Sequence, residues 1–151
     1  MRVNFVTQWY PPEPAGPAYA PAIGLTQRGH EVNVLTGFPN YPTGRIYDGY
    51  SLKPYSRERG ADGITVHRVP IYPSHDANAV KRMGNYLSFA TSASVAGQFL
   101  PPADVWLTYS SPATAALPRM LQRPGRRAPR GGPVRSGSRA IQAAQRDDQG
   151  R

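Results

Sequence analysis

Short apolar runs alternate along this chain with longer segments that have helical spacing. Four runs are too short for helices and are predicted as strands or extended segments: Arg2–Thr7, Glu31–Thr36, Ile64–Ile71 and Asp104–Tyr109. A further extended segment is expected at Ser51–Arg59, and Gly60–Gly63 is predicted as the turn that follows it, because Asp and Gly tolerate turn dihedrals.

The first helix is expected over about Ala15–Arg28. Gly29 suits the left-handed position just past a helix end. Pro17 is tolerable near the first turn, but Pro21 is a poor interior residue and predicts a late start or a kink. Ser111 followed by Pro112 is typical of a helix start, so a last helix is expected over 113–121.

The longest helical pattern covers Asn78–Phe99 and stops before two prolines. Its apolar residues recur at helical spacing: Val80, Met83, Tyr86, Leu87, Ala90, Val95 and Phe99. We predict that this apolar face belongs to the core. Contact with a membrane surface is the second interpretation, because Lys81 and Arg82 lie beside apolar residues.

The order of elements predicts the fold class. It reads strand, helix, strand, hairpin-like insertion, helix, strand, helix, which is typical of half of a doubly wound α/β sheet. A chain of 151 residues can bury one sizeable core but is too short for two such domains. We find no internal repeat.

Composition divides the chain into two parts. Residues 119–151 hold nine Arg and two acidic residues, and so carry most of the net charge of +9. Residues 122–151 contain one Val and one Ile as their only large apolar side chains, and no aromatic residue follows Tyr109. We therefore predict a folded domain over 1–121 and a disordered Arg/Gly/Pro-rich tail over 122–151.

Composition also limits the chemistry and the location. Because the chain has no Cys, disulfides and thiolate metal sites are excluded, and no metal site is expected. No apolar run approaches the length of a spanning helix, and the N-terminus turns polar too soon for a signal peptide. A cytoplasmic protein is therefore expected. If the long helix contacts a membrane, the protein would be peripheral at the inner face of that membrane.

The loop Phe38–Tyr50 is the first candidate site, since it opens at the carboxyl end of a predicted strand, where α/β sheets bind ligands. Asn40, Tyr41 and Arg45 offer amide, phenol and guanidinium groups that suit sugar hydroxyls and phosphate. The alternative is a rigid surface loop with a solvated Arg45. Both interpretations stay open.

Four more residues are candidates for binding, each with a structural alternative. Gly16 follows the first strand and would allow close approach of backbone to a ligand, or it forms a plain turn. His75 beside Asp76 is a candidate phosphate ligand or base, although a surface polar residue is the more common case. Ser110 and Ser111 end the last strand and offer sugar contacts, or Ser111 caps the next helix.

Five segments resemble family-4 glycosyltransferases, closest to the subgroup used in bacterial cell-surface polysaccharide synthesis. They are Phe5–Pro14, Arg28–Val32, Leu35–Tyr47, Val69–His75 and Asn85–Ala90. The resemblance covers residues 1–121 and implies an incomplete Rossmann-like half of a GT-B fold. It also implies retaining, metal-independent sugar transfer with no cofactor, the nucleotide sugar being a substrate.

The resemblance further implies that residues 1–121 form the acceptor-side domain and that the donor-binding domain is missing. The primary prediction is therefore a glycosyltransferase domain in cell-envelope polysaccharide biosynthesis, inactive alone, whose intact enzyme transfers sugar to a lipid-linked or saccharide acceptor. No catalytic residue is assigned. Relatives continue with a further strand where this chain becomes Arg-rich after Arg119, so a frameshifted or truncated product is our hypothesis for the tail.

Two other classes of function stay open. One is a non-catalytic module that binds the acceptor. The other is unspecific anion binding through the Arg-rich tail, which has charge but no aromatic residue for base stacking and no nucleic-acid motif. Specific nucleic-acid binding is not expected, and the sequence leaves the oligomeric state open.

Overall fold

The structure is a computed structural model of the chain, and it describes residues 1–73 and 79–109. The elements follow in the order β1 (Arg2–Val6), α1 (Gly16–Gln27), β2 (Glu31–Gly37), β3 (Ser56–Arg59), β4 (Thr65–Val69), α2 (Ala79–Gly97) and β5 (Val105–Thr108). The last predicted helix and the tail over 122–151 lie outside the described residues.

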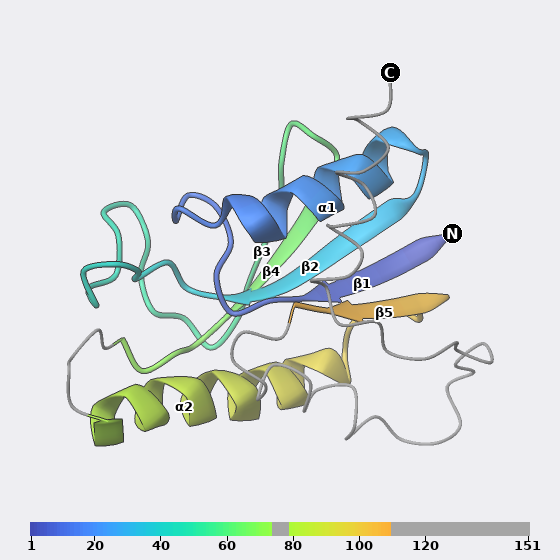
Figure 1. Ribbon diagram of the computed structural model, residues 1–151. Helices are drawn as coiled ribbons and strands as arrows, with labels where there is room; N and C mark the ends of the chain where they lie inside the picture. Colours follow the sequence, from blue (N-terminus) through green and yellow to red (C-terminus); the bar gives the residue numbers. More distant parts are fainter. Residues whose placement is uncertain (74–78, 110–151) are drawn as a thin grey trace.

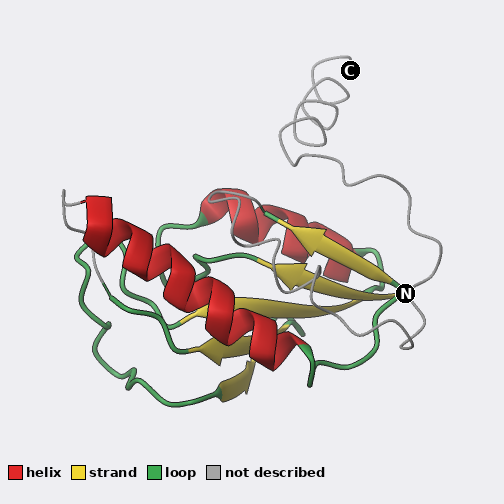
Figure 2. Ribbon diagram, turned by 90° about the horizontal axis from the view of Figure 1, so that it is seen from below, coloured by secondary structure: helices red, strands yellow, loops and turns green. Residues whose placement is uncertain are grey.

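The five strands form one sheet in the order β3-β4-β2-β1-β5. Strands β1, β2, β4 and β5 are parallel, and β3 pairs with β4 in the antiparallel direction. Helix α1 covers one face of the sheet and α2 the other (Figures 1 and 2). This arrangement confirms the predicted α/β class, a Rossmann-like half sheet with helices on both faces.

Alternation along the strands supplies a core on each face. Phe5, Val34 and Val66 pack toward α1, where Ala18 and Ala22 face the sheet. On the other face, Val6, Leu35 and Val69 of the strands pack with Phe89 and Ala93 of α2 and with Leu100. All six residues are at most 4% exposed. Parallel sheets bury both faces, which explains why β2 is buried from its second residue to its last.

The predicted boundaries hold within a few residues, with two corrections. Gly29 has the expected positive φ of 79°, so the end of α1 is confirmed. Residues 51–55 are not strand, and the extended segment begins only at Ser56. Pro21 does not delay the helix, because α1 begins at Gly16 and includes it. Pro21 lies just past the first turn, where the loss is one intrahelical hydrogen bond.

Most of the apolar stripe of α2 does not belong to the core, which corrects the prediction. Five residues of the predicted stripe are half to four-fifths exposed: Val80, Met83, Leu87 and Val95 in α2, and Phe99 just after it. Ala90 is buried and Tyr86 half-buried. The face that packs on the sheet is formed instead by Asn85, Phe89 and Ala93, which lie on the opposite side of the helix. Helical spacing alone cannot tell which of two faces meets the sheet.

A buried histidine on β4 makes stability depend on pH. His67 is 2% exposed and hydrogen-bonds through Nδ1 to the Tyr55 hydroxyl. Burial, with a smaller contribution from the positive charge of Arg57, lowers the pKa of His67 to about 4. The unfolded chain therefore binds a proton at this residue at a higher pH than the folded chain does.

We expect the free energy of unfolding to fall by about 3 kcal/mol as the pH is lowered from 6.5 to 4. Urea denaturation at several pH values measures this. His67→Gln removes this part of the pH dependence, whereas His30→Gln, at the half-buried end of the turn after α1, leaves it in place. An unchanged pH profile in His67→Gln would contradict the assignment.

Candidate functional site

The loops that follow the parallel strands meet at one edge of the sheet, here called the carboxyl edge (on the left in Figure 1). The first loop, residues 7–15, follows β1. The second loop, residues 38–55, follows β2, and residues 70–73 follow β4. The predicted position of the site therefore corresponds to the edge where open α/β sheets bind ligands.

A buried carboxylate joins the first loop to the second. Glu13 is 3% exposed, and its Oε1 accepts hydrogen bonds from the backbone N–H groups of Asn40 and Tyr41, both at 2.8 Å. Its Oε2 accepts a third from the N–H of Tyr10 at 3.2 Å. One side chain thus fixes the start of the loop that carries three of the predicted site residues.

The environment of Glu13 acts on its pKa in two directions. Burial is the largest effect and raises the pKa of the carboxyl group above its ordinary value. The three backbone N–H donors, and to a smaller extent the guanidinium of Arg68, favour the ionised form and limit the rise. The hydrogen bonds offset part of the desolvation cost of this carboxylate. We therefore assign Glu13 a structural role, that of holding both loops in place.

A buried guanidinium holds the same loops from the β4 side. Arg68 is 2% exposed and pairs with Glu58 through Nε. Its Nη2 donates to the carbonyl oxygen of Pro11 at 2.7 Å, and its Cζ lies 5.0 Å from the centre of the Tyr50 ring. Arg68 therefore contacts the first loop and the far end of the loop Phe38–Tyr50 at once.

Two buried amides link the first loop to α2. The Nδ2 of Asn85 donates to the carbonyl oxygen of Tyr72, and its Oδ1 accepts from Nε2 of Gln8. Gln8 is 1% exposed, and its Oε1 has no hydrogen-bond partner among the described residues. This amide pair lies where the ends of β1 and β4 approach α2.

Gly16 lies at the carboxyl edge as the first residue of α1. It is exposed, and a Cβ built there would meet no atom within 4 Å. The preceding residue, Ala15, gives the helix no side-chain cap, so the first N–H groups of α1 lack that partner. Packing within the described residues does not require glycine at this position.

The residues of the second loop differ in what they can offer a ligand. Asn40 is 3% exposed, and its Nδ2 donates to the carbonyl oxygen of Phe38, so its amide is used within the loop. Tyr41 is half-buried, with its ring 5.4 Å from that of Trp9. Arg45 is exposed and is the first cation along this loop. Of the three, Arg45 has the most accessible polar group.

The remaining predicted site residues, His75, Ser110 and Ser111, lie outside the described residues. Their roles stay predictions. Within the described ranges, 1–73 and 79–109, no group of three or more His, Cys, Asp or Glu side chains is arranged to hold a metal ion. In the same ranges, no helix is both long and apolar enough to cross a bilayer.

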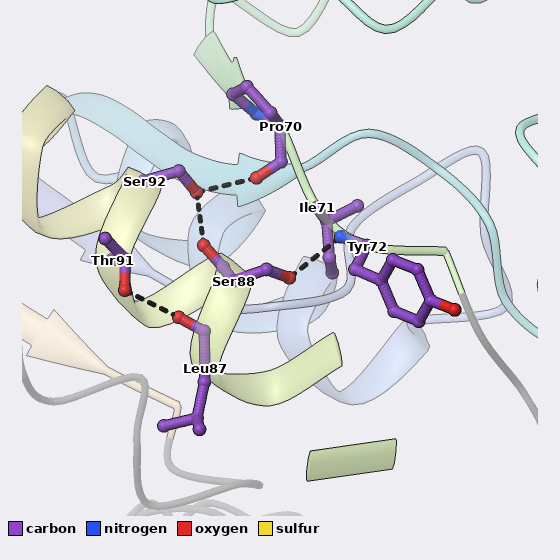
Figure 3. A pocket seen from close by; sticks show the side chains of 7 residues that line it. All are labelled: Pro70, Ile71, Tyr72, Leu87, Ser88, Thr91 and Ser92. Atoms are coloured by element: carbon purple, nitrogen blue, oxygen red, sulfur yellow. Dashed lines mark hydrogen bonds between the residues drawn. The ribbon is translucent and has the colours of Figure 1, made fainter. Parts of the chain in front are cut away.

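An open groove lies beside the site, between α2 and the segment after β4 (Figure 3). It has a volume of about 520 Å³ and is lined mainly by apolar surface from Pro70, Ile71, Tyr72, Leu87, Ser88, Thr91 and Ser92. The hydroxyl groups of its serines are used internally: Ser92 donates to the carbonyl oxygen of Pro70, and Ser88 accepts from the N–H of Tyr72. The groove therefore offers apolar contacts more than polar ones.

Sequence reasoning missed the residues that organise this edge. No pattern in the sequence singles out Glu13 or Arg68, yet both are almost fully buried. A charged residue inside the apolar strand Thr65–Val69 was the available signal, because Arg is rarely buried unless it is paired. The arrangement can position polar loop groups over the carboxyl edge.

Comparison with known proteins gives one similarity. The chain is 41% identical over 69 residues to the "Putative colanic acid biosynthesis glycosyl transferase WcaI" of Escherichia coli (strain K12). The match covers 46% of this chain and 16% of that protein, so the chain spans a small part of its relative's length. No protein-family model and no solved structure matches. The chain thus contains a glycosyltransferase-like segment.

Proposed function

We propose that this chain is the acceptor-side part of a family-4-like glycosyltransferase with a GT-B fold. The observation that carries the proposal is a glycosyltransferase-like segment in a half sheet whose two carboxyl-edge loops are fixed by one buried residue, Glu13. Such an edge is built to hold loop groups in place, as binding sites require.

The intact enzyme would transfer a sugar from a nucleotide sugar to a lipid-linked or saccharide acceptor, in the cytoplasm and for polysaccharide of the cell envelope. We propose retaining, metal-independent transfer without a cofactor. The donor nucleotide would be held by residues beyond this half sheet, and this chain would supply Gly16, Tyr41 and Arg45 on the acceptor side. Alone, the chain is expected to be inactive.

The test is calorimetric titration of the folded chain with two kinds of ligand. A panel of nucleotide sugars is expected to show no saturable binding. A soluble alkyl-diphosphate-linked saccharide is expected to bind, and Arg45→Gln to weaken that binding about tenfold, since a charge-assisted hydrogen bond to phosphate is lost. Circular dichroism checks that each variant is folded.

The matched control is Lys53→Gln, which removes an exposed cation farther along the second loop. It is expected to leave the affinity within about twofold, because a solvated charge away from the ligand contributes little. Saturable binding of nucleotide sugars, without binding of the saccharide probe, would assign the donor side to this chain and overturn the proposal.

A further inference from the structure

Two aromatic rings from different loops meet at the carboxyl edge. Trp9 belongs to the first loop and Tyr41 to the second, and their ring centres lie 5.4 Å apart with 43° between the ring planes. Both side chains are half-buried. Rings inclined at this angle do not cover each other face to face, so both keep surface for a further contact. The sequence points to the phenol of Tyr41, whereas the structure adds the two rings as a pair.

The backbone around Trp9 is held on both sides of the residue. The hydroxyl group of Thr7 donates a hydrogen bond to the carbonyl oxygen of Trp9 at 3.0 Å. The N–H of the next residue, Tyr10, donates to the buried carboxylate of Glu13 at 3.2 Å. These two bonds fix the start of the indole side chain relative to the end of β1.

The backbone of Tyr41 is held at its N–H and at its carbonyl oxygen. Its N–H donates to Glu13 at 2.8 Å, and its carbonyl oxygen accepts from the hydroxyl group of Tyr47. The second of these bonds closes a turn of the second loop, and the exposed Arg45 lies within this turn. An aromatic ring and a cation are therefore presented together by one tethered segment.

The chemistry of the ring pair suits a sugar better than a flat base. The face of an aromatic ring carries negative partial charge, so it attracts the C–H groups on one face of a sugar ring. A flat base stacks on one plane at a time, whereas a puckered sugar ring directs C–H groups in several directions and can contact both inclined rings. Neither ring is charged, and the charged part of a ligand has Arg45 as its partner instead.

We propose that Trp9 and Tyr41 form a platform on which one sugar ring of the acceptor packs, with Arg45 at the phosphate next to that ring. The inference rests on the acceptor-side function proposed above and names how the saccharide is recognised there. Because Glu13 holds the backbone beside both aromatic residues, the platform exists before the ligand binds, and less ordering is needed on binding.

Two kinds of ligand that differ only in the sugar test the platform in the full chain. One is a soluble alkyl diphosphate, and the other is the same compound carrying one glucose, galactose or N-acetylglucosamine. Calorimetric titration of the parent chain is expected to show tighter binding of at least one glycosylated compound, by about fivefold to tenfold. Trp9→Leu is expected to lose this preference but to bind the bare alkyl diphosphate as the parent chain does. A general disturbance of the loops would weaken both.

Conservative and matched variants make the assignment specific. Trp9→Phe keeps an aromatic face and is expected to retain most of the preference for the sugar. Tyr41→Leu is expected to reduce the preference. Its control is Tyr86→Leu, which removes a half-buried tyrosine from α2 and is expected to leave the preference unchanged. Circular dichroism checks that each variant is folded.

Tryptophan fluorescence reports on the platform directly. The chain has two Trp residues, so Trp106→Phe leaves Trp9 as the only one. Its emission is expected to change saturably with a glycosylated compound and much less with the bare alkyl diphosphate.

Three outcomes would overturn the proposal, and they differ in what they leave standing. An equal preference for the sugar in the parent chain and in Trp9→Leu would exclude the platform and leave the acceptor-side function in place. Saturable binding of a nucleoside diphosphate that changes Trp9 emission, without preference for the sugar compounds, would assign the rings to the base of the donor. Binding of no compound by the folded parent chain would exclude both the platform and the acceptor-side function.

Discussion

Replacing Glu13 by alanine is expected to lower the free energy of unfolding by about 3 to 5 kcal/mol, because three backbone N–H groups lose their acceptor and each unsatisfied buried donor costs about 1 to 3 kcal/mol. Urea denaturation at neutral pH measures the loss. The first and second loops are expected to exchange their amide hydrogens faster as well, because this side chain joins them.

A graded pair of variants makes the prediction for Glu13 specific. Glu13→Gln keeps an amide oxygen where Oε1 accepts from Asn40 and Tyr41, and loses only the acceptor for Tyr10, so about 1 to 2 kcal/mol is expected. Burial disfavours the ionised form of Glu13, so a neutral amide at this position avoids that desolvation cost and the loss of stability in Glu13→Gln is smaller. Glu31→Ala, in an exposed ion pair with Arg2, is the control and should cost at most about 1 kcal/mol. Equal losses in Glu13→Ala and Glu31→Ala would contradict the role of Glu13.

The sequence predicts the fold well because each element has local signals that agree with one another. Gly29 ends α1 and has a positive φ, and the turn at Gly60–Gly63 precedes β4 as expected, with Gly63 at φ 81°. The apolar strands are short and bounded by turns, so the α/β alternation follows directly. Pro21 is different, because the free-energy cost of a proline in a helix depends on its position: the first turn has no hydrogen bond to lose, whereas a later position loses one.

The faces of α2 could not be predicted in the same way. The sheet side of this helix carries the polar residue Asn85 among its buried residues, while leucine and methionine lie on the solvent side. Asn85 is buried because Gln8 and the carbonyl oxygen of Tyr72 satisfy its amide. Gln8 is 77 and Tyr72 is 13 residues away in the sequence, so no local pattern contains these partners.

The position of the candidate site could be predicted, but the roles of its residues could not. Parallel strands direct their following loops to one edge, which is a property of topology. Whether an amide in such a loop faces a ligand or its own backbone depends on tertiary hydrogen bonds. Asn40 faces its own loop, whereas Arg45 extends into solvent. For this reason we expect binding losses from Arg45 and structural losses from Asn40.

Replacing Arg68 by alanine is expected to lower the free energy of unfolding by about 3 kcal/mol. The variant leaves the carbonyl oxygens of Pro11 and Gly37 without their donor and removes the cation beside the Tyr50 ring. Glu58 is 41% exposed at its side chain and can be solvated, so the loss stays below that of a fully buried pair.

Arg59→Ala serves as the control for Arg68, because it removes an exposed guanidinium from β3 and should change stability by at most about 0.5 kcal/mol. Arg68→Met separates volume from charge: it fills the space but donates no hydrogen bond. If hydrogen bonding holds the loops, Arg68→Met loses nearly as much stability as Arg68→Ala, and amide exchange rises in both loops. If Arg68→Met is as stable as the parent chain, residue 68 contributes to this edge by packing alone. The loop positions would then owe nothing to the charge of Arg68, and the carboxyl edge would rest on Glu13.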